Sequence, residues 1–175
     1  MIRKAEKKDL SRIAEILVFD KRMNYRSIFK NDDYSFHVLQ VLDVAKEYAQ
    51  PEILDHIFVY DDGIVKGLIH LEQTEIAEFY VDHFFQNQGI GAALTGACID
   101  CAKEAGFRQL ELEVVGDNEN AVRLYKKYGF MEYGRNPRGF LTRDGRWQEL
   151  VLMRLELEDV GARENDAGNG ESDVF

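Results

Sequence analysis

The chain has 175 residues, 45% of them hydrophobic, with two prolines and a formal net charge of −10. This length is sufficient for one domain with a sizeable core, and no apolar run approaches the ~18 residues of a membrane span. The start, MIRKAEKKDL, lacks the apolar centre of a signal peptide, and basic residues gather only in short clusters, so we expect a cytoplasmic protein that binds neither membrane nor nucleic acid.

The N-terminal third is predicted to hold one strand and two helices. Residues 2–5 read as a strand, and Asp9 opens or caps a helix whose apolar residues recur at helical spacing up to Leu17. A longer helix follows, with one apolar stripe over residues 34–48. It is expected to stop at Gln50, because the residue before a proline is disfavoured in the helical conformation.

Three strands are expected next. Residues 56–60 and 64–73 are rich in β-branched and aromatic side chains, and Asp62-Gly63 between them is a strong hairpin signal. Residues 74–84 read as a further strand, although their apolar residues do not alternate cleanly.

The C-terminal half alternates helices and strands. A helix begins near Gly89 and ends at Gly106, where glycine favours helix termination. Residues 110–115 alternate as a strand does, a short helix follows over 119–128, and a last hairpin occupies 130–157.

The order β-α-α-β-β-β-α-β-α-β-β predicts a single mixed α/β domain over residues 1–157. Residues 158–175 are polar and glycine-rich, so we expect a disordered C-terminal tail.

The stretch QNQGIGAAL, residues 86–94, places Gly89 and Gly91 where a helix should begin. Glycine disfavours a helix by roughly 0.5–1 kcal/mol relative to alanine. One interpretation is functional: the first backbone N–H groups of a helix have no partner inside it, and glycine lets a phosphate approach them. The other is a tight turn that needs small residues for packing. A P-loop would need Gly-Lys-Ser/Thr, and a dinucleotide fingerprint would need its third glycine earlier than position 96.

Gln86, Gly89, Gly91 and Ala92 resemble the coenzyme A signature Q/R-x-x-G-x-G/A of the GNAT N-acetyltransferase superfamily, and Val81 matches its usual upstream valine. NENAVRLYKKYGF, at 118–130, is similar to the second segment of the family, and one helix and one strand separate the two segments, as in the family. The resemblance covers residues 1–157 and implies the fold of the family. That fold is a mixed, mostly antiparallel sheet of about seven strands flanked by about four helices.

The resemblance also implies a coenzyme site. Acetyl-coenzyme A would be the co-substrate, its pyrophosphate held by backbone N–H groups of the signature and its pantetheine arm lying where the fourth and fifth strands splay apart. The implied coenzyme-binding residues are Tyr80, Val81, Gln86, Asn87, Gln88, Gly89, Ile90, Gly91, Ala92 and Asn120. Asn87 and Gln88 are neutral where the family often has Arg or Lys, so the phosphates would rely more on the backbone.

The implied reaction is direct transfer of the acetyl group to a primary amine. A thiol has a pKa of about 8.5 and a phenol one of about 10, so Tyr125 can protonate the departing thiolate. For the base we favour Glu78 over Glu75, with water as a further alternative, and backbone N–H near Val81 would hold the oxyanion. A small polyamine, an aminoglycoside, an amino acid and a protein N-terminus all remain open as acceptors.

Two other functions are weighed against this one. The same fold could bind an acyl-coenzyme without catalysis, as a sensor or an interaction module. Cys98 and Cys101 have the C-x-x-C spacing of redox or zinc sites, but they lie inside a predicted helix and have no second ligand pair. We therefore expect core packing for both and no metal, and a homodimer is left open.

Overall fold

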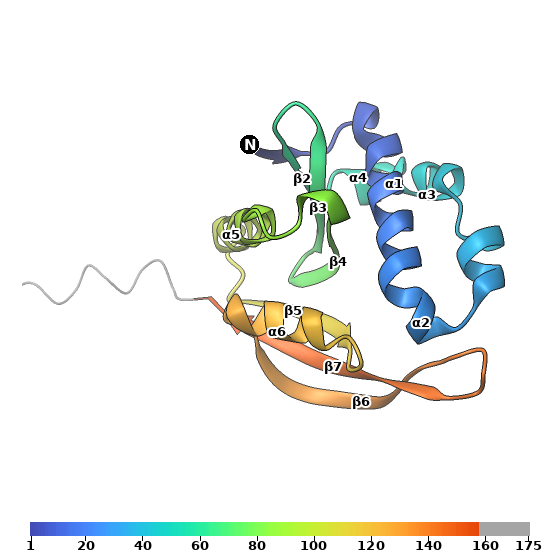
Figure 1. Cartoon of the computed structure of the whole chain (residues 1–175). Coiled ribbons are helices and arrows are strands. Elements are labelled where there is room, and N and C mark those ends of the chain that lie inside the picture. Colours follow the sequence, from blue (N-terminus) through green and yellow to red (C-terminus); the bar gives the residue numbers. More distant parts are fainter. Residues whose placement is uncertain (158–175) are drawn as a thin grey trace, which may run out of the picture.

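The computed structural model describes residues 1–157, which form one seven-stranded sheet in the order β1-β2-β3-β4-β5-β7-β6 (Figure 1). Its strands are β1 (Ile2–Lys4), β2 (Ile57–Asp61), β3 (Val65–Glu72), β4 (Glu75–Val81), β5 (Gln109–Val115), β6 (Met131–Leu141) and β7 (Trp147–Glu156). Neighbouring strands are antiparallel except for β4 and β5, which are parallel. The predicted mixed, mostly antiparallel sheet is thereby confirmed, and the predicted tail at 158–175 lies outside the described residues.

Helices flank the sheet on both sides. The α-helices of residues 1–157 are α1 (Leu10–Asp20), α2 (Arg26–Phe29), α3 (Val41–Tyr48), α4 (Pro51–Leu54), α5 (Ile90–Glu104) and α6 (Glu119–Lys127). Since α2 and α4 are single turns of four residues, the four longer helices agree with the expected number. Short 3-10 or π-helical segments lie at 7–9, 21–25, 34–38 and 83–85.

Two apolar clusters build the core, one on each face of the sheet. On one face, Ile13 and Leu17 of α1 pack with Leu68 of β3, together with side chains of α3. On the other face, Leu94 and Cys98 of α5 pack over β5 and β7, and α6 adds its apolar side to the margin of this cluster. The helices α1 and α5 therefore lie on opposite sides of β3 and β4 (Figure 1).

The long second helix expected over residues 34–48 is interrupted. Tyr34–Val38 is a π-helical segment, and Leu39 then leaves the helical conformation with φ −76° and ψ 92° before α3 begins. Arg22 stabilises the interruption, because its guanidinium donates to the carbonyl oxygens of Ser35 (2.7 Å) and Leu39 (2.8 Å). These bonds satisfy backbone acceptors that a continuous helix would have paired.

Strand β4 has two irregularities that shape the molecule. His70 of β3 faces Glu78, whereas the next residue of β3 faces Ile76, so Ala77 is an extra residue in β4 and forms a β-bulge. On its other edge, β4 pairs with β5 only where Glu75 faces Glu111. From that point the two strands diverge, as the resemblance implied.

The two cysteines belong to α5. Cys98 is fully buried in the core cluster, where burial raises the pKa of its thiol to about 12. Cys101 is partly buried at the margin of the same cluster, and both thiols are free. The expected packing role is confirmed for Cys98, which behaves as a small hydrophobe.

Candidate active site

A cleft of about 630 Å³ opens where β4 and β5 diverge. Its volume lies within the range usual for small-molecule sites, roughly 300–1,000 Å³. The β4–α5 connection and the start of α5 form one side, α6 forms another, and the end of α1 forms a third. Of the residues singled out in the sequence, the cleft is lined by Tyr80, Val81, Gln86, Asn87, Gly89, Ile90, Gly91, Ala92, Asn120 and Tyr125. Gln88 is exposed outside this lining.

The N-terminus of α5 faces the cleft with its backbone donors uncapped. Gly89 is the N-cap residue, and no side chain of the described residues caps the helix there. The backbone N–H groups of Ile90, Gly91 and Ala92 belong to the first turn, which has no acceptors inside the helix. Uncapped donors of this kind, together with the helix dipole, are suited to an anionic ligand.

The two glycines of this turn serve different purposes. Gly89 has φ +82°, a left-handed conformation that glycine adopts readily, and a Cβ added there would meet no atom within 4 Å. A Cβ on Gly91 would instead lie 2.8 Å from the Tyr128 hydroxyl oxygen. Glycine is therefore required at position 91 by packing against Tyr128. At position 89 it allows the left-handed turn and leaves the N-terminus of α5 accessible. The packing interpretation of the stretch thus agrees with the contacts of Gly91, and the phosphate interpretation stays a prediction for Gly89.

The β4–α5 connection is held to the end of β4. The Gln86 side chain donates to the carbonyl oxygen of Val81 (3.2 Å), and Asn87 has a positive φ of 61°. Asp82 accepts from the backbone N–H of Phe84 (2.9 Å) and forms an ion pair with Arg12 of α1. The connection therefore presents its backbone to the cleft in a fixed position.

Tyr125 projects from α6 into the cleft and is held by aromatic neighbours. Its ring centroid lies 6.0 Å from that of Phe79 and 5.9 Å from that of Phe130. Burial is the main cause that raises the pKa of its phenol, and the nearby Tyr25, Glu78 and Asp20 raise it further. The phenol therefore stays protonated through the neutral range and is available as a proton donor.

Two elements that are far apart in sequence meet across the cleft. The Tyr25 phenol, from the π-helical segment after α1, is hydrogen bonded to the Asn118 side chain. Asn118 is the N-cap of α6, and its Oδ1 accepts from the backbone N–H of Ala121 (3.2 Å). This contact joins the end of α1 to the start of α6, so both helices are positioned around one space.

Glu78, the sequence candidate for the base, lies beside the cleft but is not part of its lining. Its carboxylate is partly buried and 3.1 Å from the ammonium nitrogen of Lys21. Tyr48 and Tyr80 are also hydrogen bonded to it. Glu75, the alternative, is exposed at the closed end, where β4 and β5 still pair. The structure thus gives Glu78 three partners in a polar cluster on the α1 side.

Asp20, a residue that the sequence reasoning missed, lines the cleft from the last turn of α1. Only 9% of it is exposed, and its Oδ1 accepts a hydrogen bond from Asn24 (2.7 Å). Burial raises the pKa of its carboxyl to about 6. A sequence signal existed, because Asp20 follows Leu17 by three residues and so continues the apolar stripe of α1, where a carboxylate is out of place.

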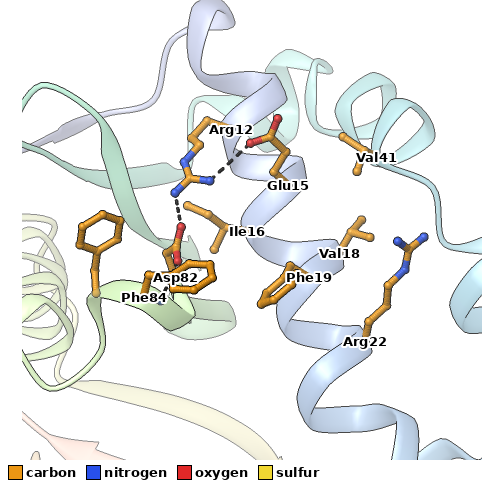
Figure 2. Close-up of a pocket in the computed structure, with 10 residues that line it drawn as sticks. Arg12, Glu15, Ile16, Val18, Phe19, Arg22, Val41, Asp82 and Phe84 are labelled. Atoms are coloured by element: carbon orange, nitrogen blue, oxygen red, sulfur yellow. Dashed lines mark hydrogen bonds and ion pairs between the residues drawn. The ribbon is translucent and has the colours of Figure 1, made fainter.

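A second pocket, of about 460 Å³, lies between α1 and the β4–α5 connection (Figure 2). Figure 2 shows Arg12 directed both to Asp82 and to Glu15, with Phe19 and Phe84 among the apolar residues that line the pocket. The rings of Phe19 and Phe84 are stacked with centroids 6.2 Å apart. Neighbouring residues of α1 thus serve two pockets, with Phe19 directed to this one and Asp20 to the cleft.

None of the helices within residues 1–157 combines the length and apolar character that crossing a bilayer requires. In the same part of the chain, no three or more His, Cys, Asp or Glu side chains are grouped so that they could hold a metal ion.

Comparison with known proteins identifies relatives. The model of the Acetyltransferase (GNAT) family matches residues 20–130. An uncharacterized N-acetyltransferase of Methanocaldococcus jannaschii is 31% identical over 111 residues, which are 63% of this chain and 45% of that protein. The ribosomal protein bS18 alanine N-acetyltransferase of Escherichia coli K12 is 33% identical over 87 residues, 50% of this chain and 58% of the relative. The matches thus span about half the length of these relatives.

Among solved structures, a putative acetyltransferase (yncA) of Salmonella typhimurium, determined with its cofactor acetyl-CoA, superposes with a TM-score of 0.69. The two proteins are 23% identical, and the match covers 94% of this chain and 98% of the other. At this identity the likeness concerns the fold, in which the seven-stranded sheet and its flanking helices agree.

Proposed function

The chain belongs to the GNAT acetyltransferase family, and on that premise we propose that it transfers an acetyl group from acetyl-coenzyme A directly to a primary amine. The observation that carries this proposal is the uncapped N-terminus of α5, which opens into the same cleft as the Tyr125 phenol. An anion site and a proton donor in one cleft suit a thioester donor that carries a pyrophosphate.

The residues around the cleft fit the coenzyme. The backbone N–H groups of Ile90, Gly91 and Ala92 would bind the pyrophosphate, with Gln86, Asn87 and Gln88 beside them. Beyond Glu75, the edge of β4 that faces β5 has no strand partner in the described chain, so it can pair with the amides of the pantetheine arm. Tyr80, Val81 and Asn120 would border that arm.

The proposed chemistry requires three events. The amine nitrogen forms a bond to the thioester carbonyl carbon, and its electron pair moves onto the carbonyl oxygen. Backbone N–H near Val81 would stabilise this oxyanion. The carbon–sulfur bond then breaks, and Tyr125 gives its proton to the departing thiolate. The nitrogen loses a proton in the process, and Glu78 is the sequence-based candidate that would receive it.

Turnover of acetyl-coenzyme A against a panel of amines tests the proposal. The panel should hold a polyamine, an aminoglycoside, free amino acids and a peptide that begins with alanine, with released thiol as the readout and mass spectrometry of the acetylated amine as confirmation. We expect thiol release that depends on at least one amine. Tight binding of the coenzyme with no turnover on any amine would instead support a non-catalytic sensor.

A substitution at Gly89 tests the coenzyme site. In Gly89→Val, the new side chain would enter the open space at the mouth of α5 and obstruct the pyrophosphate. We expect the affinity for coenzyme A to fall by about tenfold or more, since one good charge-assisted contact is worth about 1.5–3 kcal/mol. Isothermal titration with coenzyme A measures the change.

Gly106→Val is the matched control for that experiment. Gly106 lies at the other end of α5, has φ +80° and likewise leaves its Cβ in open space. The two variants therefore carry the same backbone strain, and only Gly89→Val should weaken binding. Equal affinities for the two variants would contradict a pyrophosphate site at Gly89. Gly91→Val is less informative, because it would also displace Tyr128.

A further inference from the structure

We propose that Asp20, and not Glu78, accepts the proton that the acceptor amine loses. The inference rests on the proposed acetyl transfer and assigns one step of it to a residue at the end of α1. It follows from the position of Asp20 in the cleft and from the partners of the two carboxylates.

Asp20 is the carboxylate that the cleft itself contains. Asp20, Asn24 and Tyr25 line the cleft from the α1 side, while Tyr125 lines it from α6. The Tyr25–Asn118 hydrogen bond fixes these two sides relative to each other. An amine that enters between them meets a carboxylate on one side and the proposed proton donor on the other.

The hydrogen bonds of the two carboxylates differ in a way that decides between them. Asn24 donates to Oδ1 of Asp20 at 2.7 Å, and Oδ2 is the oxygen that we assign to receive the proton. Glu78 already accepts from Lys21, Tyr48 and Tyr80. A proton on Glu78 would remove the negative charge that attracts Lys21, 3.1 Å away, whereas Asn24, which donates to Asp20, is neutral.

The surroundings of Asp20 also suit a base that works near neutral pH. Burial raises the pKa of its carboxyl to about 6; the hydrogen bond from Asn24 and the charges of His83 and Lys21 lower it, and Glu78 raises it. The phenols of Tyr25 and Tyr125 face it as neutral groups. A base with a pKa close to the working pH combines an ionised form with useful proton affinity.

The amine arrives as an ammonium ion and gives one proton to Asp20 Oδ2, so that a neutral amine and a carboxylic acid result. The amine nitrogen then bonds to the thioester carbon, the carbon–sulfur bond breaks, and the thiolate takes the Tyr125 proton. The second nitrogen proton returns to Tyr125 through solvent, and Asp20 releases its own proton to solvent before the next cycle.

The test uses three variants of the full chain and an amine that the wild type acetylates. Asp20→Asn keeps the shape and the bond from Asn24 but cannot accept a proton. We expect kcat/KM at pH 7 to fall by about 10²–10³-fold. The loss should shrink steadily as the pH rises toward the pKa of the amine, because the substrate then arrives already neutral. Coenzyme affinity should change less than threefold.

Glu15→Gln is the matched control, since Glu15 lies on the same helix, outside the cleft, and is paired with Arg12. It should leave the rate and its pH profile unchanged. The assignment would be overturned if kcat/KM of Asp20→Asn at pH 7 lay within threefold of wild type. It would also be overturned if the loss of kcat/KM were constant between pH 6 and 10. If Glu78→Gln shows the pH-dependent loss instead, the base is Glu78. A wild type that acetylates no amine overturns the proposed function itself and this assignment with it.

Discussion

Tyr125→Phe is expected to lower kcat by about 10²–10⁴-fold, the range typical of a lost general acid. The substitution keeps the ring that packs between Phe79 and Phe130 and removes only the hydroxyl. Melting temperature and coenzyme affinity should therefore change little. Because the proton is given in the transition state, kcat should carry the loss rather than the Michaelis constant for the acetyl donor.

Steady-state kinetics with an active amine measures this effect, with chemistry shown to be rate-limiting. Tyr133→Phe is a suitable control, because Tyr133 is half exposed on β6 and packs against Arg154, away from the cleft. A Tyr125→Phe enzyme within twofold of wild type in kcat would make Tyr125 a packing residue. The thiolate would then take its proton from water or from the amine.

The environment of Tyr125 adds an expectation about pH. Burial raises the pKa of the phenol above its usual value near 10. The phenol therefore still carries its proton at pH 9. Loss of that proton should not lower wild-type activity below about pH 10, so in this range the pH profiles of wild type and Tyr125→Phe should have the same shape.

Asp20→Asn is expected to stabilise the folded protein above pH 6 by about 3 kcal/mol. The Asp20 carboxyl has a pKa of about 6 in the folded protein, against an ordinary value of 3.8. Each unit of difference corresponds to about 1.4 kcal/mol. The folded state therefore binds the proton more tightly, and wild-type stability decreases as the pH rises from 3.8 to 6.

An asparagine has no such proton, so the variant should escape this loss. Urea unfolding of both proteins between pH 4 and 8 measures the difference, which should be smallest at pH 4 and reach its maximum above pH 6 to 7. In melting temperature the gain corresponds to roughly 6–12 °C for a chain of this size. A stability difference that does not vary with pH would mean that Asp20 is not the buried acid described above. An Asp20→Asn variant that is more stable and slower than wild type would show the trade-off between stability and activity that is expected of a buried functional carboxyl.

The parts of the site that depend on local sequence could be predicted. The Gly89 turn, the helix that follows it and the segment around Tyr125 are each set by neighbouring residues, and the structure places them where the pattern indicated. The β2–β3 hairpin can be predicted in the same way, because Asp62-Gly63 is a local turn signal.

Asp20 could not be assigned in the same way, because its role depends on where α1 packs. Its helix has ordinary amphipathic spacing, and only the fold shows that Asp20 ends beside α6 rather than in solvent. The partners of Glu78 are likewise set by tertiary packing, since Lys21 and Tyr48 are 57 and 30 residues away in the sequence. The break at Leu39 depends on Arg22, a contact that periodicity does not reveal.

The single pairing between β4 and β5 has a consequence for how the protein opens. The sheet consists of a half formed by β1 to β4 and a half formed by β5, β7 and β6, joined along the sheet only where Glu75 meets Glu111. Local opening starts where few hydrogen bonds must break, and this seam is such a place. A coenzyme seated there would connect the two halves along their length. Coenzyme binding should therefore slow hydrogen exchange most at the backbone amides on the edge of β4 that faces β5. With the coenzyme bound, the two halves should unfold more nearly as one unit.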